Sequence, residues 1–166
     1  MSREIRMVPV DWEHPRKPDG QFIPLFDGDP APLQSDWDSE AEQWDKGFSK
    51  DYSATPVWWK TREEDCSYAE WAGARPRNED YMPNWPQEDR THLMLYETTS
   101  EGTPKSPALP TVEELARWLA DSGATVFADE TLSYEEWLTF CQRGWAPTLA
   151  MTQNESMSGV KFLSNG

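Results

Sequence analysis

The chain has 166 residues, with 30 acidic against 15 basic side chains and a formal net charge of −15. This length fits a single domain with a hydrophobic core, and the excess of acids repels nucleic-acid phosphates and anionic lipid headgroups. We therefore expect no direct binding to nucleic acid and none to a membrane, whereas a partner with a basic surface is favoured. Ten tryptophans argue against disorder, because disordered chains are poor in large aromatic residues.

The compartment follows from the N-terminus and from the cysteines. The opening MSREIRMVPV lacks the apolar run of a secretory signal, and no apolar stretch approaches the ~20 residues of a membrane span. We expect a cytoplasmic protein. Cys66 and Cys141 have no CxxC spacing, so two buried free thiols are expected, with a disulfide as the alternative.

Residues 1–34 are predicted to be an irregular, Pro- and Trp-rich segment packed on the body of the domain. Six prolines lie between residues 9 and 32, and proline both blocks helix interiors and removes a strand hydrogen-bond donor. The segment is expected to attach through its apolar side chains, which are Trp12, Phe22, Ile23, Leu25 and Phe26.

Residues 27–45 concentrate the negative charge, with seven carboxylates and no lysine, arginine or histidine. The pattern predicts an acidic helix over residues 35–48, capped by Ser35. On that helix Trp37, Ala41 and Trp44 would share a stripe about 60° wide, which would bury two indoles against the body. The candidate partner-binding carboxylates are Asp27, Asp29, Asp36, Asp38, Glu40, Glu42 and Asp45.

Two interpretations of this charge remain open. Carboxylates at positions i and i+4 of a helix lie about 5–6 Å apart, near the spacing of successive phosphates in a nucleic-acid strand. Two acidic ridges beside a buried indole stripe would then imitate a polyanion, and the alternative is a solvated face that serves solubility. No metal or cofactor is expected, although Asp27, Asp29, Asp36 and Asp38 could converge on a magnesium ion.

Residues 91–147 are more regular and predict strand, helix, strand and helix in turn. Strands are expected over 91–99 and 124–128, and 148–166 is a tail or edge strand that includes 158–163. The fold class is α+β, with a small mixed sheet, two to four helices and a βαβ unit as one option. Capping boxes begin the two helices, and glycines end them: Thr111 with Glu114 before Gly123, and Ser133 with Glu136 before Gly144.

The polar stretch 96–107 between the first strand and its helix is a candidate recognition loop, or else an ordinary connection. A small-ligand pocket lined by tryptophan and this loop is a second option. The candidate recognition residues are Tyr96, Glu97, Thr98, Thr99, Ser100 and Glu101.

Catalytic motifs are absent from the sequence. Only His14 and His92 can exchange protons near neutral pH, and His92 lies in an expected strand where a structural role is favoured. No GxSxG, HExxH, Walker or GxGxxG motif occurs, and the Cys and His spacings match no zinc site. We predict no catalytic residue, and an enzyme is the weaker class.

Several stretches carry a resemblance to a known group of proteins: VPVDWEHP, FIPLFDG, CSYAEWAGARP, DYMPNWP and HLMLYETTSEGTPKSP with TVEELARWLADSGA after it. Together they make the chain similar to small uncharacterised acidic proteins of tailed phages and prophages of enteric bacteria. The resemblance implies a phage accessory protein made in the bacterial host cell, and it carries over no functional residues.

The leading hypothesis is a non-catalytic protein whose acidic face binds and inhibits a basic, nucleic-acid-binding host protein. In the phage context the target would be a defence component and the protein a DNA mimic. One alternative is a small-ligand-binding protein or metal-dependent enzyme that works from an aromatic and acidic pocket near residues 96–107. Another is a virion or assembly component, and a homodimer is left open.

Overall fold

A computed structural model describes residues 3–98, 102–146, 150–151 and 156–157. The backbone contacts divide the chain into two compact units. Unit 1 comprises Met1–Asp27 and Pro83–Gly166, and unit 2 comprises Gly28–Met82. The boundaries fall at a glycine and a proline, which are typical of linkers. Each unit is described by itself.

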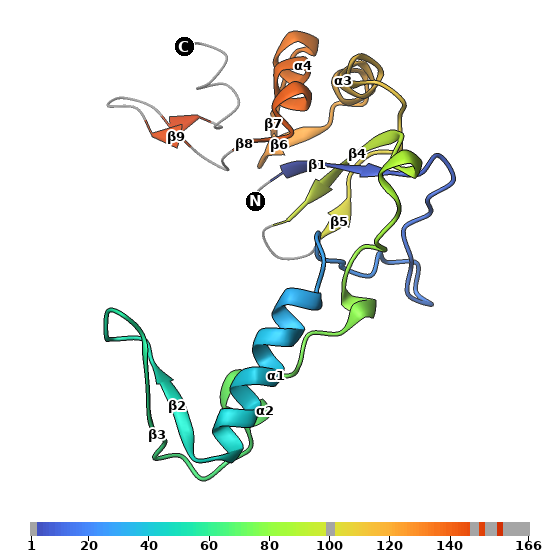
Figure 1. Cartoon of the computed structure of the whole chain (residues 1–166). Coiled ribbons are helices and arrows are strands. Elements are labelled where there is room, and N and C mark those ends of the chain that lie inside the picture. Colours follow the sequence, from blue (N-terminus) through green and yellow to red (C-terminus); the bar gives the residue numbers. More distant parts are fainter. Residues whose placement is uncertain (1–2, 99–101, 147–149, 152–155, 158–166) are drawn as a thin grey trace. The chain divides into compact units, whose positions relative to one another are not determined.

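Unit 1 is built on a four-stranded sheet in the order β5-β4-β1-β8 (Figure 1). Its strands are β1 (Arg3–Val8), β4 (His92–Glu97), β5 (Thr103–Pro104) and β8 (Trp145–Ala146). Every neighbouring pair is antiparallel, with Ile5 opposite Leu95 in the central ladder. The strand predicted over 91–99 is therefore confirmed as β4, whereas β1 has no counterpart in the sequence prediction.

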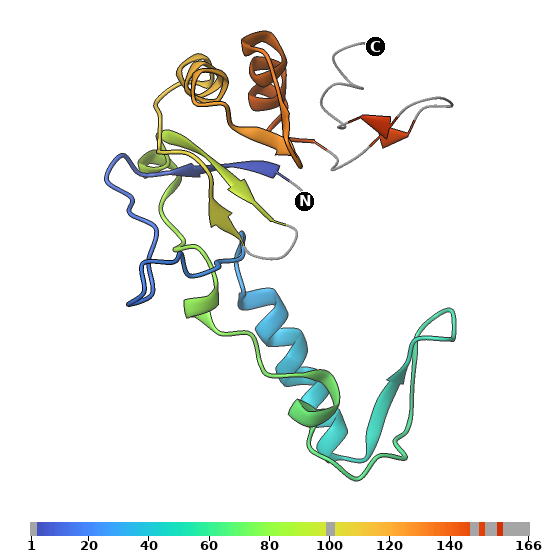
Figure 2. The same cartoon turned by 180° about the vertical axis from the view of Figure 1, so that it is seen from behind.

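Two helices, α3 (Val112–Asp121) and α4 (Tyr134–Arg143), cover one face of this sheet (Figure 2). Their apolar stripes meet the sheet in a core that has no solvent exposure at Leu95, Leu115 and Leu119. Both predicted helices are confirmed. The Glu114 N–H donates to Thr111 Oγ1 at 3.1 Å to begin α3, and a complete capping box joins Ser133 with Glu136 to begin α4. Gly144 ends α4 in the left-handed conformation.

The predicted strand over 124–128 is present as β6 (Thr125–Phe127), but its pairing differs from a βαβ unit. It forms a two-stranded antiparallel hairpin with β7 (Glu130–Thr131) instead of joining the main sheet. Only Ala128 and Asp129 connect the two strands, and a connection of this length suits a tight hairpin. Beyond it, β9 (Ala150–Met151) pairs with β10 (Ser156–Met157), and the edge strand predicted over 158–163 lies outside the described residues.

The Pro- and Trp-rich stretch after β1 packs against the other face of the sheet. Trp12 and His14 both make hydrogen bonds to the Tyr96 hydroxyl, and Leu25 is buried. Arg6 Nη1 donates to the Leu25 carbonyl at 2.8 Å, while its guanidinium lies over the Tyr96 ring. These contacts give the irregular segment a fixed path despite its prolines.

Unit 2 contains α1 (Ala31–Asp45), a hairpin of β2 (Phe48–Asp51) and β3 (Trp58–Thr61), and the short helix α2 (Tyr68–Ala72). The acidic helix begins four residues before the predicted cap, Ser35, and ends earlier than predicted. Proline fits the first turn of a helix, where its missing N–H is not needed, so Pro32 does not block α1. Gly47, with φ of +95°, separates α1 from β2.

The fold class α+β is confirmed, with four α-helices among the described residues. Short 3₁₀ turns at Asn78–Asp80 and Gln87–Asp89 complete the regular structure. None of the described helices has the length and apolarity that crossing a membrane would require.

Candidate functional site

The acidic helix α1 does not present its carboxylates as two free ridges. Asp38 forms a two-pronged ion pair with Arg75, whose Nε and Nη2 donate to the carboxylate at 2.7 and 2.8 Å. This hydrogen bonding holds the pKa of Asp38 below its ordinary value. On the same helix, Lys46 Nζ donates to Glu42 at 2.6 Å. The ridge formed by Asp38, Glu42 and Asp45 is therefore interrupted by bases of the same chain.

Glu40 is paired as well, in a less exposed position. Lys50 Nζ, from β2, donates to Glu40 Oε1 at 2.5 Å, and the Tyr68 hydroxyl donates to Oε2 at 2.6 Å. Burial raises the pKa of Glu40, but the hydrogen bonds from Lys50 and Tyr68 outweigh it, and the net shift is downward. Glu40 is thus an anchor between α1, β2 and α2.

The remaining predicted carboxylates fall into different environments. Asp27 belongs to unit 1, and Asp29 accepts the Ala31 N–H at 2.9 Å, which orders the approach to α1. Asp36 and Asp45 are exposed, and neither has an ion-pair partner within the described part of the chain. These two are the helix acids left for an external cation.

The predicted indole stripe is only partly buried. Trp44 has 1% of its surface exposed, and its Nε1 donates to the Cys66 carbonyl at 2.7 Å. Trp37 is half-buried and packs edge-on against Tyr68. The indoles do anchor α1, as expected, but the partners are the hairpin and α2 of unit 2.

A set of exposed aromatic side chains surrounds this anchor and was not predicted from the sequence. We call it the aromatic cluster. All five members lie on the β2–β3 hairpin or on α2, and their exposed fractions run from 41% to 71%: Phe48, Tyr52, Trp58, Trp59 and Trp71. Large aromatic residues exposed together on one small unit are typical of contact surfaces rather than of free surface.

The predicted recognition loop divides between a buried strand and undescribed residues. Tyr96 and Glu97 lie in β4 and are buried, with Glu97 between Arg3 at 3.4 Å and Lys105 at 3.0 Å. They are not loop residues, because the strand continues to Glu97 and pairs with β5. Thr98 is in the turn that follows, and Thr99, Ser100 and Glu101 lie outside the described residues.

His14 is held in a chain of hydrogen bonds beneath the sheet. Its Nε2 lies 2.6 Å from the Ile23 carbonyl, which can only accept, so Nε2 carries the proton. Nδ1 therefore accepts from the Tyr96 hydroxyl at 3.0 Å, and that hydroxyl accepts from Trp12 Nε1 at 3.1 Å. Burial lowers the pKa of His14, with Arg6 and Arg16 adding to the effect, so the imidazole is neutral at pH 7. The polar groups of Trp12, Tyr96 and His14 are thus all engaged in hydrogen bonds that hold the segment after β1 in place.

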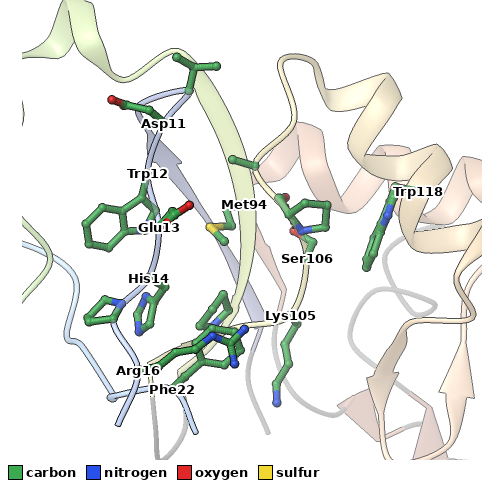
Figure 3. Close-up of a pocket in the computed structure, with 15 residues that line it drawn as sticks. Asp11, Trp12, Glu13, His14, Arg16, Phe22, Met94, Lys105, Ser106 and Trp118 are labelled. Carbon is green, nitrogen blue, oxygen red and sulfur yellow. Dashed lines mark hydrogen bonds between the residues drawn. The ribbon is translucent and has the colours of Figure 1, made fainter. Parts of the chain in front are cut away.

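A groove of about 1130 Å³ opens beside this chain in unit 1 (Figure 3). Trp12 and His14 lie on one side of it and Trp118 on the other, with Met94 between them. Residues 104–108 form part of its wall, so the C-terminal end of the predicted recognition stretch does reach a pocket. The lining mixes aromatic, acidic and basic side chains.

The structure offers no metal centre in the residues it describes. No three His, Cys, Asp or Glu side chains there come together as ligands, so the four aspartates considered for magnesium do not converge. Cys66 and Cys141 are both free thiols. Burial raises the pKa of Cys141 to about 12, which leaves it unreactive. His92 shares a hydrogen bond with Thr91 at the start of β4.

Comparison with known proteins gives no match: no protein family, no curated protein and no solved structure resembles this chain significantly. The functional argument therefore rests on the geometry and the charge of the two units.

Proposed function

We propose that this is a non-catalytic binding protein, which engages a basic, nucleic-acid-binding host protein through unit 2 and blocks it. The observation that carries the proposal is the aromatic cluster, exposed on the unit with more negative charge per residue. Buried Trp and Tyr side chains supply most of the binding energy in many protein interfaces, so five exposed aromatics offer candidate anchors.

The charge of unit 2 supports a basic partner. Gly28–Met82 contains 13 acidic and 6 basic residues, a net charge of −7 in about a third of the chain. Such a field steers a basic surface toward the unit and excludes acidic ones. Because Asp38, Glu40 and Glu42 are paired within the chain, the proposal differs from simple phosphate mimicry. Aromatic contacts would provide the affinity for the partner, and the unpaired carboxylates would orient its basic surface toward unit 2.

As the biological context we propose a phage or prophage origin. A phage accessory protein made in the bacterial cytoplasm encounters host proteins that bind nucleic acid through basic surfaces. An acidic surface with aromatic anchors can cover such a site, and the host protein would then lose access to DNA or RNA. Inhibition of a host defence protein fits this scheme.

The experiment begins with the full chain immobilised and exposed to a bacterial lysate at low salt. A captured protein is then purified, and its affinity is measured as a function of salt and of competing DNA. We expect the affinity to fall steeply with salt and DNA to compete. Binding that is insensitive to both would contradict the proposal.

Charge variants localise the contact. Asp36→Asn with Asp45→Asn should weaken binding and reduce its salt dependence. The matched control, Asp121→Asn with Asp129→Asn, removes the same charge from exposed sites of unit 1 and should change binding less. Equal effects of the two pairs would place the contact outside unit 2.

The groove of unit 1 favours a second candidate function, the binding of a small ligand. Its volume of about 1130 Å³ is slightly above the usual range of ligand pockets, about 300–1,000 Å³, and two tryptophans, Trp12 and Trp118, lie on its walls (Figure 3). A ligand that raises the melting temperature of the wild-type protein, but not of Trp118→Ala, would support this function over the first.

A further inference from the structure

Glu40 lies in an enclosure of aromatic rings in unit 2, which we call the Glu40 cage. A small cavity of about 60 Å³ is bounded there by Glu40, Lys50 and Ser49 together with six aromatic side chains. The aromatic members come from α1, α2 and the hairpin: Trp44, Phe48, Tyr52, Trp59, Tyr68 and Trp71. Four of these rings also belong to the aromatic cluster.

The carboxylate in the Glu40 cage is fixed in place. The Tyr68 hydroxyl donates to Oε2 at 2.6 Å and the Tyr52 hydroxyl at 3.3 Å, while Oε1 faces Lys50. Only 19% of the Glu40 side chain is exposed. One carboxylate oxygen is therefore held by hydroxyls, and the other is directed at a cation.

Aromatic faces and a carboxylate together form a site for an organic cation. The ring quadrupole attracts an ammonium or guanidinium group within about 6 Å of the ring centre, and a carboxylate adds a charged acceptor. The chain already shows this chemistry, because Lys50 Nζ is 2.5 Å from Glu40 and 5.6 Å from the Trp59 ring centre.

Lys50 lies where the Glu40 cage borders solvent. About 31% of its side chain is exposed, against 19% of the Glu40 side chain. Its strand belongs to a two-stranded hairpin in which all four residues of β3 are exposed. A cation that displaces the Lys50 ammonium would enter from this exposed side.

We propose that the Glu40 cage binds the ammonium or guanidinium head group of a partner in place of Lys50. The inference rests on the proposed function and deepens it, since a basic partner presents such head groups on lysine and arginine side chains. The shared chemistry is a compact organic cation, and a free amine would meet the same groups.

The test titrates purified full-length protein with tetramethylammonium chloride, and separately with short acetylated peptides that contain one lysine or arginine. Ionic strength is held constant with NaCl, and binding is followed by tryptophan fluorescence and NMR. We expect saturable binding to the wild type and binding at least about threefold tighter to Lys50→Met, which removes the competing ammonium and keeps the apolar stem.

Two variants provide the controls. Glu40→Gln should abolish saturable binding, and Lys46→Met, which breaks the other lysine–glutamate pair of α1 outside the cage, should behave as the wild type. Absence of saturable binding in both the wild type and Lys50→Met would overturn the inference, as would equal binding by Glu40→Gln. If Lys50→Met fails to fold, the wild-type and Glu40→Gln titrations decide alone.

The two ligand arms separate the sources of the cation. Tighter binding of the peptides than of tetramethylammonium assigns the cage to a protein side chain, and the reverse order assigns it to a free quaternary amine. No host protein enters this titration. If the titration shows no cation binding, the proposed binding of a basic host protein still stands. If no host protein is captured from the lysate, binding of small cations by the Glu40 cage still stands.

Discussion

Unit 1 and unit 2 use their aromatic and aliphatic residues in opposite ways. Unit 1 encloses a core between its sheet and two helices, with Leu115, Leu119 and Trp137 wholly buried. Unit 2 buries Trp44 and Met82, whereas the residues of the aromatic cluster are 41% to 71% exposed. A chain selected for stability alone would bury such rings, because each is worth about 1.5–3 kcal/mol when fully buried. Under the proposed function, unit 1 stabilises the protein and unit 2 carries its contact surface.

The largest expected effect is in unit 2, where one indole acts as the core. Trp44→Ala should lower the free energy of unfolding of unit 2 by about 3–5 kcal/mol. Hydrogen exchange measures this directly, and protection should be lost in α1 and β2. Trp59→Ala, with its ring 44% exposed, is the matched control and should retain protection. Unchanged hydrogen-exchange protection of α1 in Trp44→Ala would contradict the role of Trp44 as the core of unit 2.

In unit 1, Leu119→Ala should cost about 2–5 kcal/mol, since it opens a cavity between α3 and the rest of the core. Urea unfolding, monitored by circular dichroism, measures this change in the free energy of unfolding. The neighbouring Trp118→Ala removes a larger side chain that is 37% exposed, and its effect should be smaller. A larger effect for Trp118 would mean that the core lies elsewhere.

A backbone test comes next in size. Gly102 has φ of +57°, and a Cβ there would overlap the Leu25 carbonyl oxygen, so Gly102→Ala should destabilise unit 1 by about 1–3 kcal/mol. Gly20→Ala has the same problem of positive φ but open space around the added carbon. The difference in melting temperature between the two variants measures the cost of the close approach between Gly102 and the Leu25 backbone. Equal melting temperatures would show that this approach costs nothing.

The smallest effect concerns pH. Burial lowers the pKa of His14 in the folded protein, whereas the unfolded chain titrates near 6.5. Below pH 6.5 the unfolded state therefore takes up a proton that the folded state refuses, and stability falls as the pH decreases through this range. An NMR titration should show the His14 ring still neutral at a pH where a free histidine is charged. A His14 midpoint at or above 6.5 would contradict the hydrogen-bond chain.

Local rules predict the parts of this fold that depend on neighbouring residues. The capping box of Ser133 with Glu136, the glycine stop at Gly144 and strand β4 follow from sequence, because a cap, a stop and a short apolar run are short-range features. Strand β1 escapes such rules, because Arg6 resembles a surface residue until Leu25 and Tyr96 are brought to it.

The candidate site shows the same limit. The carboxylates of α1 are visible in sequence, but the bases that pair with them, Arg75 and Lys50, arrive through tertiary structure. The start of α1 is hidden by prolines that a first turn tolerates. The aromatic cluster leaves one trace in sequence, the apolar run Val57, Trp58 and Trp59 between Pro56 and Lys60, yet exposure is decided by packing.

The central claim is that the aromatic cluster exists for contact rather than for stability. The direct measurement compares Trp58→Ala/Trp59→Ala with Trp118→Ala in unit 1, for both partner affinity and free energy of unfolding. We predict that the double variant loses about 30-fold or more in affinity, as hot-spot residues do. Its stability should change by no more than about 1 kcal/mol. Retained affinity with a marked loss of stability would contradict it.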